Sequence, residues 1–269
     1  MYMKNTNMKP WYRQSVYRKD IHKITNKLDN EIDFIAIGDL HGCYNTLQDL
    51  LSFVKANIPN FENYKIISVG DITNKGGQKA CINGDKNNSG SVKILRWAMK
   101  EYAQGKLLIV DSNHGRNLIK RLRFDKASIN PNIEITYKDI VMQDDFINFR
   151  DEIIDFLDNL PPYLRIYSKD KREYIIAHAS ASDRLIKQDK LSKVEYDYFL
   201  YNNLDFKWSN NSTVITGHVG VAKPEKIVNN NGEIIRLDTK VETGNGLSFY
   251  DSVTKTLSTI PTNINDIHI

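Results

Sequence analysis

The sequence has few cysteines and no long apolar run, and each absence excludes a class of protein. Two cysteines, Cys43 and Cys81, occur among 269 residues without zinc-knuckle spacing, so we expect reduced thiols rather than a disulfide framework. No stretch approaches the roughly 18 uninterrupted apolar residues that a bilayer crossing needs. Residues 1–10 are polar where a signal peptide would have an apolar core. These absences predict a cytoplasmic protein with no membrane partner.

A large excess of one charge is also missing from most of the chain. The net charge is +4, and 41% apolar with 26% charged residues is ordinary for a globular protein. The basic residues concentrate in an N-terminal arm, residues 1–30, which has seven Lys or Arg against two Asp. With Trp11, Tyr12 and Tyr17 interleaved, this arm could contact nucleic acid. The alternative is an amphipathic helix that packs on the rest of the protein.

From residue 31 onward, short apolar segments alternate with segments of helical periodicity, which predicts a single α/β domain over residues 31–269. Strands are expected at 32–37, 65–69, 107–110, 174–177, 213–216, 234–237 and 247–250, and helices at 45–55, 91–104, 117–123 and 146–160. Residues 76–90 are rich in turn formers and predict an insertion loop, ordered beside a site or disordered at the surface. The unpatterned stretch 124–144 is expected to be loop, within a cap-like segment at 124–165.

Each of the first five expected strands runs into a polar cluster. The clusters contain Asp39 and His41; Asp71, Asn74 and Lys75; Asn113 and His114; His178; and His218. Because the carboxyl ends of strands in an α/β sheet converge on one crevice, these side chains are expected to meet. Mixed carboxylate, amide and imidazole ligation suits Mn²⁺, Fe or Zn²⁺ better than Ca²⁺ or Mg²⁺ alone. One such cluster is typical of a turn, whereas five in order predict a metal centre.

The order of the clusters resembles the calcineurin-like metallophosphoesterases of the phosphoprotein phosphatase type. That family has GDxHG, GDxxDRG, GNHE or GNHD, HAG or HGG, and GH, where this chain has GDLHG, GDITNKG, SNHG, HAS and GH. The segments GDLHGCYNTLQDLL and GHVGVAKPEKIVNNNGEIIRLDT are more similar to the bacterial and phage branch. That branch includes the phosphatase module of polynucleotide kinase-phosphatase, diadenosine tetraphosphatase and the phage protein phosphatases. The resemblance implies an αββα fold, with two mainly mixed β-sheets between helices.

The resemblance also implies a role for each matching residue. Asp39 and His41 would hold one metal ion, Asp71 would bridge both ions, and Asn113, His178 and His218 would complete the second site. Two divalent ions, with Mn²⁺ favoured and Fe or Zn²⁺ as alternatives, would provide a bridging hydroxide that attacks phosphorus. His114 would protonate the leaving alcohol as general acid.

The chain departs from the family beside this site. Asn74 and Lys75 replace Asp-Arg, so the carboxylate that supports the acid is lost and an ammonium replaces a guanidinium fork. Arg116 or Arg184 could supply the missing guanidinium, although arginines in such positions are usually solvated. All six metal-ligand positions are retained.

These observations predict a dimetal phosphoesterase that hydrolyses a phosphomonoester or phosphoanhydride. Its substrate would be a phosphoprotein, a nucleic acid end or a nucleotide, because fold and metal site do not fix the substrate. The alternative is a catalytically weakened or silent relative that acts as a nucleotide or nucleic-acid binding module. The sequence leaves the oligomeric state open.

Overall fold

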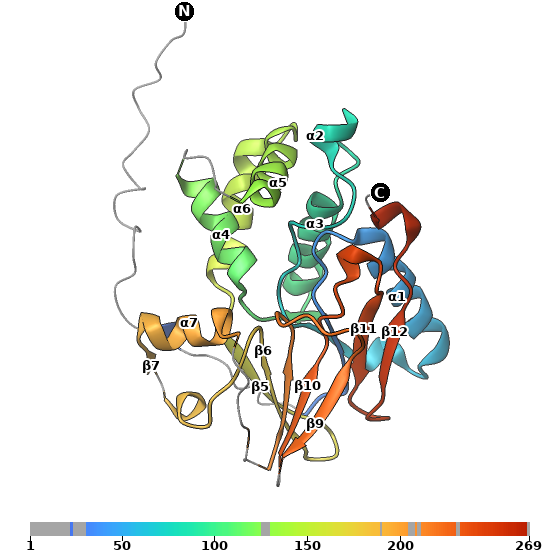
Figure 1. Ribbon diagram of the computed structural model, residues 1–269, viewed down its shortest axis with the longest axis vertical. Helices are drawn as coiled ribbons and strands as arrows, with labels where there is room; N and C mark the ends of the chain where they lie inside the picture. Colours follow the sequence, from blue (N-terminus) through green and yellow to red (C-terminus); the bar gives the residue numbers. More distant parts are fainter. Residues whose placement is uncertain are drawn as a thin grey trace, which may run out of the picture.

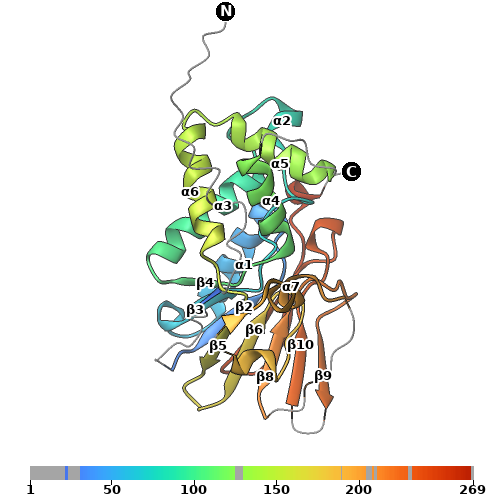
Figure 2. The same cartoon turned by 90° about the vertical axis from the view of Figure 1, so that its left-hand side faces the viewer.

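The computed structural model describes residues 22–23, 31–124, 130–188, 190–203, 208, 211–229 and 232–267. Two five-stranded sheets pack against each other, and helices cover their outer faces (Figures 1 and 2). The predicted αββα architecture with two mixed sheets is thereby confirmed.

The first sheet has the strand order β12-β11-β2-β3-β4. Its strands are β2 (Phe34–Ile37), β3 (Lys65–Ser68), β4 (Leu107–Ile109), β11 (Leu247–Asp251) and β12 (Leu257–Ile260). Strands β2, β3 and β4 are parallel, with Ile37 opposite Ser68 and Ser68 opposite Ile109. Their carboxyl ends are therefore level, which brings the residues that follow them side by side.

The second sheet has the strand order β5-β6-β8-β10-β9. Its strands are β5 (Tyr163–Tyr167), β6 (Glu173–Ala177), β8 (Thr213–Thr216), β9 (Glu225–Asn229) and β10 (Gly232–Arg236). The central strands β6, β8 and β10 are parallel, and the edge strands β5 and β9 are antiparallel to their neighbours. A separate two-residue pair joins β1 (His22–Lys23) to β7 (Lys190–Leu191).

The helices form an outer layer on each sheet. Against the first sheet lie α1 (Tyr44–Asn57), α3 (Gly90–Ala103), α4 (Asn113–Arg123) and α6 (Phe146–Asp158), and α7 (Lys193–Tyr201) packs on the second. The short α2 (Ala80–Asn83) and α5 (Pro131–Val141) lie at the far end of the helical layer (Figures 1 and 2). No helix in the described ranges combines the length and apolar character needed to cross a bilayer.

The hydrophobic core has three parts that correspond to these layers. Between the sheets, Phe34 and Ile67 of the first meet Ile176 and Ile215 of the second, all fully buried. A larger cluster fills the space between the first sheet and α1, α3, α4 and α6. A third cluster joins the second sheet to α7 and includes the buried Trp208. Both sheets are covered on both faces, as their continuous apolar strands require.

The seven predicted strands are present with ends shifted by two residues at most, but several elements were missed. The expectation of loop at 124–144 is wrong, because α5 occupies most of its described part. The side chain of Asn130 caps this helix, Pro131 is its first residue, and Ile133, Tyr137 and Ile140 repeat at helical spacing. The strands β5, β9 and β12 were missed because each lies at a sheet edge, where tertiary pairing rather than apolar sequence selects the strand.

The segment 76–90 is ordered against the body, so the alternative of a disordered surface loop is wrong. Gly77 has a φ of 69°, and an added Cβ there would lie 1.8 Å from the carbonyl oxygen of Gly42. Such close backbone contact requires glycine. Apart from residues 22–23, the predicted basic arm lies outside the described residues, and the division into arm and single domain stays a prediction.

Asp266, near the C-terminal end of the described chain, caps α1 from a distance in sequence. Its buried carboxylate accepts hydrogen bonds from the side-chain amide of Asn45 (2.9 Å) and from the backbone amide (2.7 Å) and hydroxyl (2.8 Å) of Thr46. We expect Asp266→Ala to lower the free energy of unfolding by roughly 2–3 kcal/mol, because buried donors lose their acceptor. Asp266→Asn, which keeps one acceptor oxygen, should lose less. Urea denaturation followed by circular dichroism measures both, and an alanine variant as stable as the parent would contradict the capping role.

Candidate metal centre

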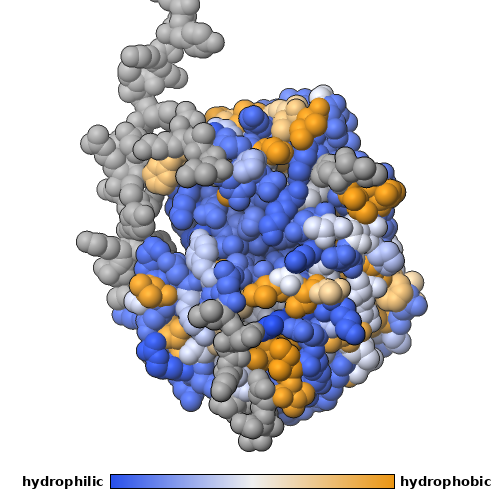
Figure 3. Space-filling view, viewed as in Figure 1, coloured by the Kyte–Doolittle hydropathy of each residue, from blue (hydrophilic) through white to orange (hydrophobic). Residues whose placement is uncertain are grey.

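The polar clusters at the five strand ends come together at one edge of the two sheets. We call the set of predicted metal ligands the candidate centre: Asp39 and His41 after β2, Asp71 after β3, Asn113 at the start of α4, His178 after β6, and His218 after β8. The strand ends meet the helices in the middle of the molecule in Figure 1, and the middle of the same face is hydrophilic in Figure 3. The convergence predicted from the strand-end rule is present.

Asp71 occupies the middle of the candidate centre. Its Oδ2 lies 3.9 Å from Nε2 of His41, 3.9 Å from Nε2 of His114 and 3.4 Å from Nε2 of His178. Two groups of donor atoms, His41–Asp71–His114 and Asp71–His178–His218, each have all atoms within 4.8 Å of one another. A carboxylate shared by two donor groups has the position of a bridging ligand.

The remaining ligand candidates adjoin these groups. Nε2 of His178 is 3.1 Å from Oδ1 of Asn113 and 3.1 Å from Nδ1 of His218. Asp39 links the two donor groups: its Oδ2 is 3.8 Å from Nε2 of His41 and accepts a hydrogen bond from the backbone amide of His218 at 3.1 Å. The six predicted ligands therefore form one continuous cluster.

Backbone carbonyls orient two of the imidazoles. Nδ1 of His178 donates to the carbonyl of Val69 at 2.9 Å, and Nδ1 of His41 donates to the carbonyl of Thr73 at 3.3 Å. Each bond turns Nε2 toward the candidate centre, as outer hydrogen bonds do for metal-binding histidines. Burial lowers the pKa of His41 to about 3, and burial together with His178 lowers the pKa of His218 to about 4. The rings of His41 and His218 are therefore neutral at pH 7, and each keeps a lone pair for a bond to a metal ion.

The two carboxylates of the candidate centre have pKa values shifted in opposite directions, and one of them has an oxygen without a partner in the described part of the chain. Burial, followed by the charges of Asp238 and Asp71, raises the pKa of Asp39 well above its ordinary value. Although burial opposes ionisation of Asp71, its contacts with His178 hold that pKa well below the ordinary value. Oδ1 of Asp39 and Nε2 of His218 are buried without a hydrogen-bond partner among the described residues. Oxygen and nitrogen donors in this state fit divalent transition metals.

The backbone at the candidate centre is strained. His41, Asp71, Asn74 and His218 have φ values of 45°, 42°, 83° and 64°, in the left-handed region that non-glycine residues rarely adopt. Beside them, a Cβ on Gly217 would lie 1.9 Å from Oδ1 of Asp39, so this close approach admits only glycine. Strained backbone of this kind clusters at functional sites, where the surrounding structure holds it in place.

Asn74 and Lys75, which replace Asp-Arg, both reach the centre. Nδ2 of Asn74 lies 3.1 Å from Nδ1 of His114. Nζ of Lys75 lies 2.9 Å from Nε2 of His41 and 3.7 Å from Oε1 of Glu242, with 36% of the side chain exposed. The structure thus places the predicted general acid, its supporting residue and a cation next to the ligand cluster.

Arg116 and Arg184 have other partners. The guanidinium of Arg116 donates to Asp111, to Asp158 at 2.8 Å and to the hydroxyl of Tyr196 at 2.7 Å. Arg184 is 72% exposed and pairs with Glu195 at 3.2 Å. These contacts favour a structural role for Arg116 over phosphate binding. Two residues apart on a helix, Arg116 and His114 point in different directions, which sequence proximity alone did not reveal.

Two acidic residues near the centre were missed. Asp238 follows β10 and raises the pKa of Asp39, and Glu242 contacts Lys75. The strand-end rule, applied to the predicted strand at 234–237, would have found Asp238. Glu242 had no comparable signal, because a turn between β10 and β11 brings it to Lys75.

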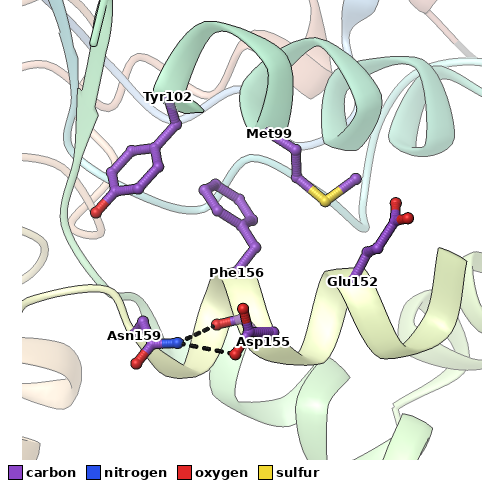
Figure 4. Close-up of a pocket in the computed structure, with 6 residues that line it drawn as sticks. All are labelled: Met99, Tyr102, Glu152, Asp155, Phe156 and Asn159. Carbon is purple, nitrogen blue, oxygen red and sulfur yellow. Dashed lines mark hydrogen bonds between the residues drawn. The ribbon is translucent and has the colours of Figure 1, made fainter. Parts of the chain in front are cut away.

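A separate surface cavity of about 340 Å³ lies between α3 and α6 (Figure 4). It is lined by Met99, Tyr102, Glu152, Asp155, Phe156 and Asn159. Within it, the amide of Asn159 donates to the backbone and side chain of Asp155 at 2.8 and 3.1 Å. No residue of the candidate centre lines this cavity.

The chain belongs to the calcineurin-like phosphoesterase family, whose sequence model matches residues 32–238. It is accordingly a metal-dependent phosphoesterase, a hydrolase that cleaves a phosphoester or phosphoanhydride bond. The matched range contains all six residues of the candidate centre.

Several known proteins are similar to this chain over most of their length. A bis(5'-nucleosyl)-tetraphosphatase PrpE of Oceanobacillus iheyensis is 25% identical over 237 residues, covering 80% of this chain and 86% of that protein. PrpE of Bacillus subtilis is 21% identical, covering 79% and 87%. A solved structure provisionally described as a diadenosine tetraphosphatase has a TM-score of 0.61 at 20% identity, covering 90% and 100%. A cold-active protein-tyrosine phosphatase of a psychrophilic Shewanella has a TM-score of 0.53 at 16% identity, covering 90% and 83%.

Proposed function

We propose that the protein hydrolyses a phosphoanhydride or phosphomonoester of a nucleotide at two divalent ions. Asp39 and His41 would hold one ion, Asn113, His178 and His218 the other, and Asp71 both. The observation that carries this proposal is the position of Asp71, which belongs to two donor groups at once. When bound, divalent ions would activate water and stabilise the negative charge that develops on the phosphoryl oxygens.

His114 is proposed as the general acid. An amide nitrogen can only donate, so the contact from Nδ2 of Asn74 makes Nδ1 of His114 an acceptor and leaves the ring proton on Nε2. Nε2 is the nitrogen that faces Asp71, where the substrate phosphorus would lie. To act as an acid, His114 must first be protonated on both ring nitrogens, since a neutral imidazole is too weak an acid to protonate a leaving oxygen. The imidazolium would give its Nε2 proton to the leaving oxygen and return to the neutral ring. Oδ1 of Asn74, which has no hydrogen-bond partner among the described residues, would turn to accept the Nδ1 proton, with less stabilisation of the imidazolium than a carboxylate gives.

Lys75 is proposed to stabilise the transferred phosphoryl group. Its ammonium is close to the ligand cluster and partly exposed, so it can reach a substrate oxygen. It acts as a single point charge in place of a bidentate guanidinium. This predicts weaker orientation of the phosphoryl group than an arginine gives, with charge stabilisation retained.

The substrate class follows from the names of the relatives, which act on bis(5'-nucleosyl) tetraphosphates. The test is a metal analysis of the full chain followed by a Mn²⁺-, Fe²⁺- or Zn²⁺-supplemented assay. The substrates are diadenosine tetraphosphate, an aryl phosphate, a phosphopeptide and a 3′-phosphorylated oligonucleotide. We expect about two ions per chain and fastest turnover of the dinucleotide. Turnover of the phosphopeptide or oligonucleotide alone would overturn the nucleotide assignment, and bound metal without turnover would favour the silent binding module.

Removal of the ions is expected to destabilise the fold. A ligand that binds the native state alone, at 100 times its dissociation constant, stabilises a protein by about 2.7 kcal/mol. We therefore expect a chelator to lower the melting temperature by roughly 5–10 °C, and Mn²⁺ to restore it. The comparison is the Asp71→Asn variant, whose melting temperature should hardly respond to the chelator. An equal response in both proteins would show that the metal effect arises elsewhere.

A further inference from the structure

The segment 76–90 contains a buried lysine that the proposed reaction does not use. Lys79 is 4% exposed, and its ammonium donates to the backbone carbonyls of Asn74, at 3.2 Å, and of Gly76. Burial lowers the pKa of Lys79, and the nearby charge of Asp139 opposes this effect. Because a buried ammonium is costly unless it is paired and hydrogen-bonded, these contacts account for how it is tolerated.

The contacts of Lys79 fall on the residue that touches the proposed general acid. Asn74 has a φ of 83°, and its backbone amide nitrogen donates to the hydroxyl of Ser91 at 3.2 Å. Lys79 binds the carbonyl oxygen of the same residue. The strained backbone of Asn74 is thus held by hydrogen bonds at both its amide nitrogen and its carbonyl oxygen. The side-chain amide of Asn74 meanwhile contacts Nδ1 of His114 at 3.1 Å.

Asp139 connects this arrangement to the helical layer. It lies on α5 and is fully buried, and its Oδ1 accepts a hydrogen bond from the backbone amide of Cys81 on α2 at 2.8 Å. Its Oδ2 has no hydrogen-bond partner among the described residues. Asp139 thus fixes the start of α2, two residues after Lys79, and its charge favours the charged form of Lys79.

We propose that Lys79 is a positioning residue that holds Asn74 against His114. The inference rests on the proposed role of His114. A carboxylate at position 74 would be held to a protonated imidazole by its charge, whereas a hydrogen bond from a neutral amide is weaker. Asn74 therefore needs a fixed backbone to maintain the contact, and Lys79 of the insertion provides it. Lys79 thereby compensates for the carboxylate that this chain lacks.

The first experiment compares two leaving groups in the full, metal-loaded protein. Lys79→Met keeps the aliphatic volume and removes the ammonium. We expect its kcat for phenyl phosphate, whose leaving group needs a proton, to fall by about 10–100-fold, as for other outer contacts of an active site. For 2,4-dinitrophenyl phosphate, whose leaving group does not need one, kcat should change less than about 2-fold. The matched control is Lys86→Met, an exposed lysine of the same segment paired with Asp144, which should leave both rates unchanged.

A double-mutant cycle tests whether Asp139 acts through Lys79. Asp139→Asn should shift the ratio of the two rates in the same direction by a smaller factor, and Lys79→Met with Asp139→Asn should be no worse than Lys79→Met alone. Unfolding curves and metal content are measured for each variant, so that lost stability or metal is separated from lost positioning. An equal loss of kcat on both substrates, or additive effects in the cycle, would overturn the proposal.

A spectroscopic measurement is independent of turnover. In the metal-free protein, the ring nitrogen resonances of His114 report which nitrogen carries the proton. We expect the Nε2–H form in the parent chain and a mixture of tautomers in Lys79→Met. Unchanged His114 resonances would overturn the inference. If the parent protein hydrolyses no phosphate ester, the proposed function fails, and this measurement alone decides the role of Lys79.

Discussion

Asp71→Asn will abolish the phosphoesterase activity and remove metal from a protein that still folds. Asp71 is the one residue common to both donor groups, and its Oδ2 faces three imidazole nitrogens within 3.9 Å. Asparagine keeps the shape but loses the charge that, in the proposed function, would bridge two cations. Since loss of an outer contact alone costs about 10–100-fold in metal affinity or activity, loss of the bridge should cost more than about 100-fold.

Elemental analysis and initial rates on the same sample measure this effect. The matched control is Asp151→Asn, which neutralises an exposed carboxylate of α6 paired with Arg150 and should keep full metal content and rate. Two bound ions and full activity in Asp71→Asn would mean that the six clustered residues are not the metal site. One bound ion with partial activity would assign Asp71 to a single ion.

His114→Asn will lower kcat on poor leaving groups by about 10²–10⁴-fold, the contribution of general acid catalysis. The same variant should lose much less on 2,4-dinitrophenyl phosphate, because that leaving group departs without a proton. Its metal content should remain that of the parent, since His114 is proposed to donate a proton and not to bind an ion. The rates on the two substrates and the metal content are measured together.

Geometry alone allows His114 a second role, because its imidazole lies in the same donor group as His41 and Asp71. If His114→Asn loses one ion and loses activity equally on both substrates, His114 is a ligand and another group is the acid. Asn74→Asp is the companion variant, since it restores a charge beside Nδ1. With His114 as acid, this variant should retain activity on poor leaving groups rather than lose it.

The Asn74–Lys75 pair is the feature that most separates this chain from the family pattern. From the sequence alone, this replacement favours a weakened or silent relative, since both the supporting carboxylate and the guanidinium are absent. In the structure, Asn74 contacts His114, where the proposed acid needs support, and Lys75 reaches the ligand cluster, where a substrate phosphoryl group would need a cation. This favours an enzyme with altered support for its acid over a silent binding module.

Local sequence by itself determined seven of the strands, the polar residues at their ends and hence the six clustered ligand candidates. A buried parallel strand has a strong apolar signal, and the residue that follows it must lie at the sheet's carboxyl edge whatever the rest of the chain does. Asp39, Asp71 and His178 could be named for this reason. Asp238 was within reach of the same rule.

Tertiary structure decided what depends on the direction of side chains and on contacts between distant segments. Arg116 is two residues from His114 in sequence, yet its guanidinium binds Asp111 and Asp158 and not the ligand cluster. Lys79 contacts the carbonyl of Asn74 because the segment 76–90 folds back onto its own start, and Asp266 binds the first turn of α1 from 220 residues away. These pairings join groups whose separation along the chain carries no periodic signal, so packing of the complete fold selects them.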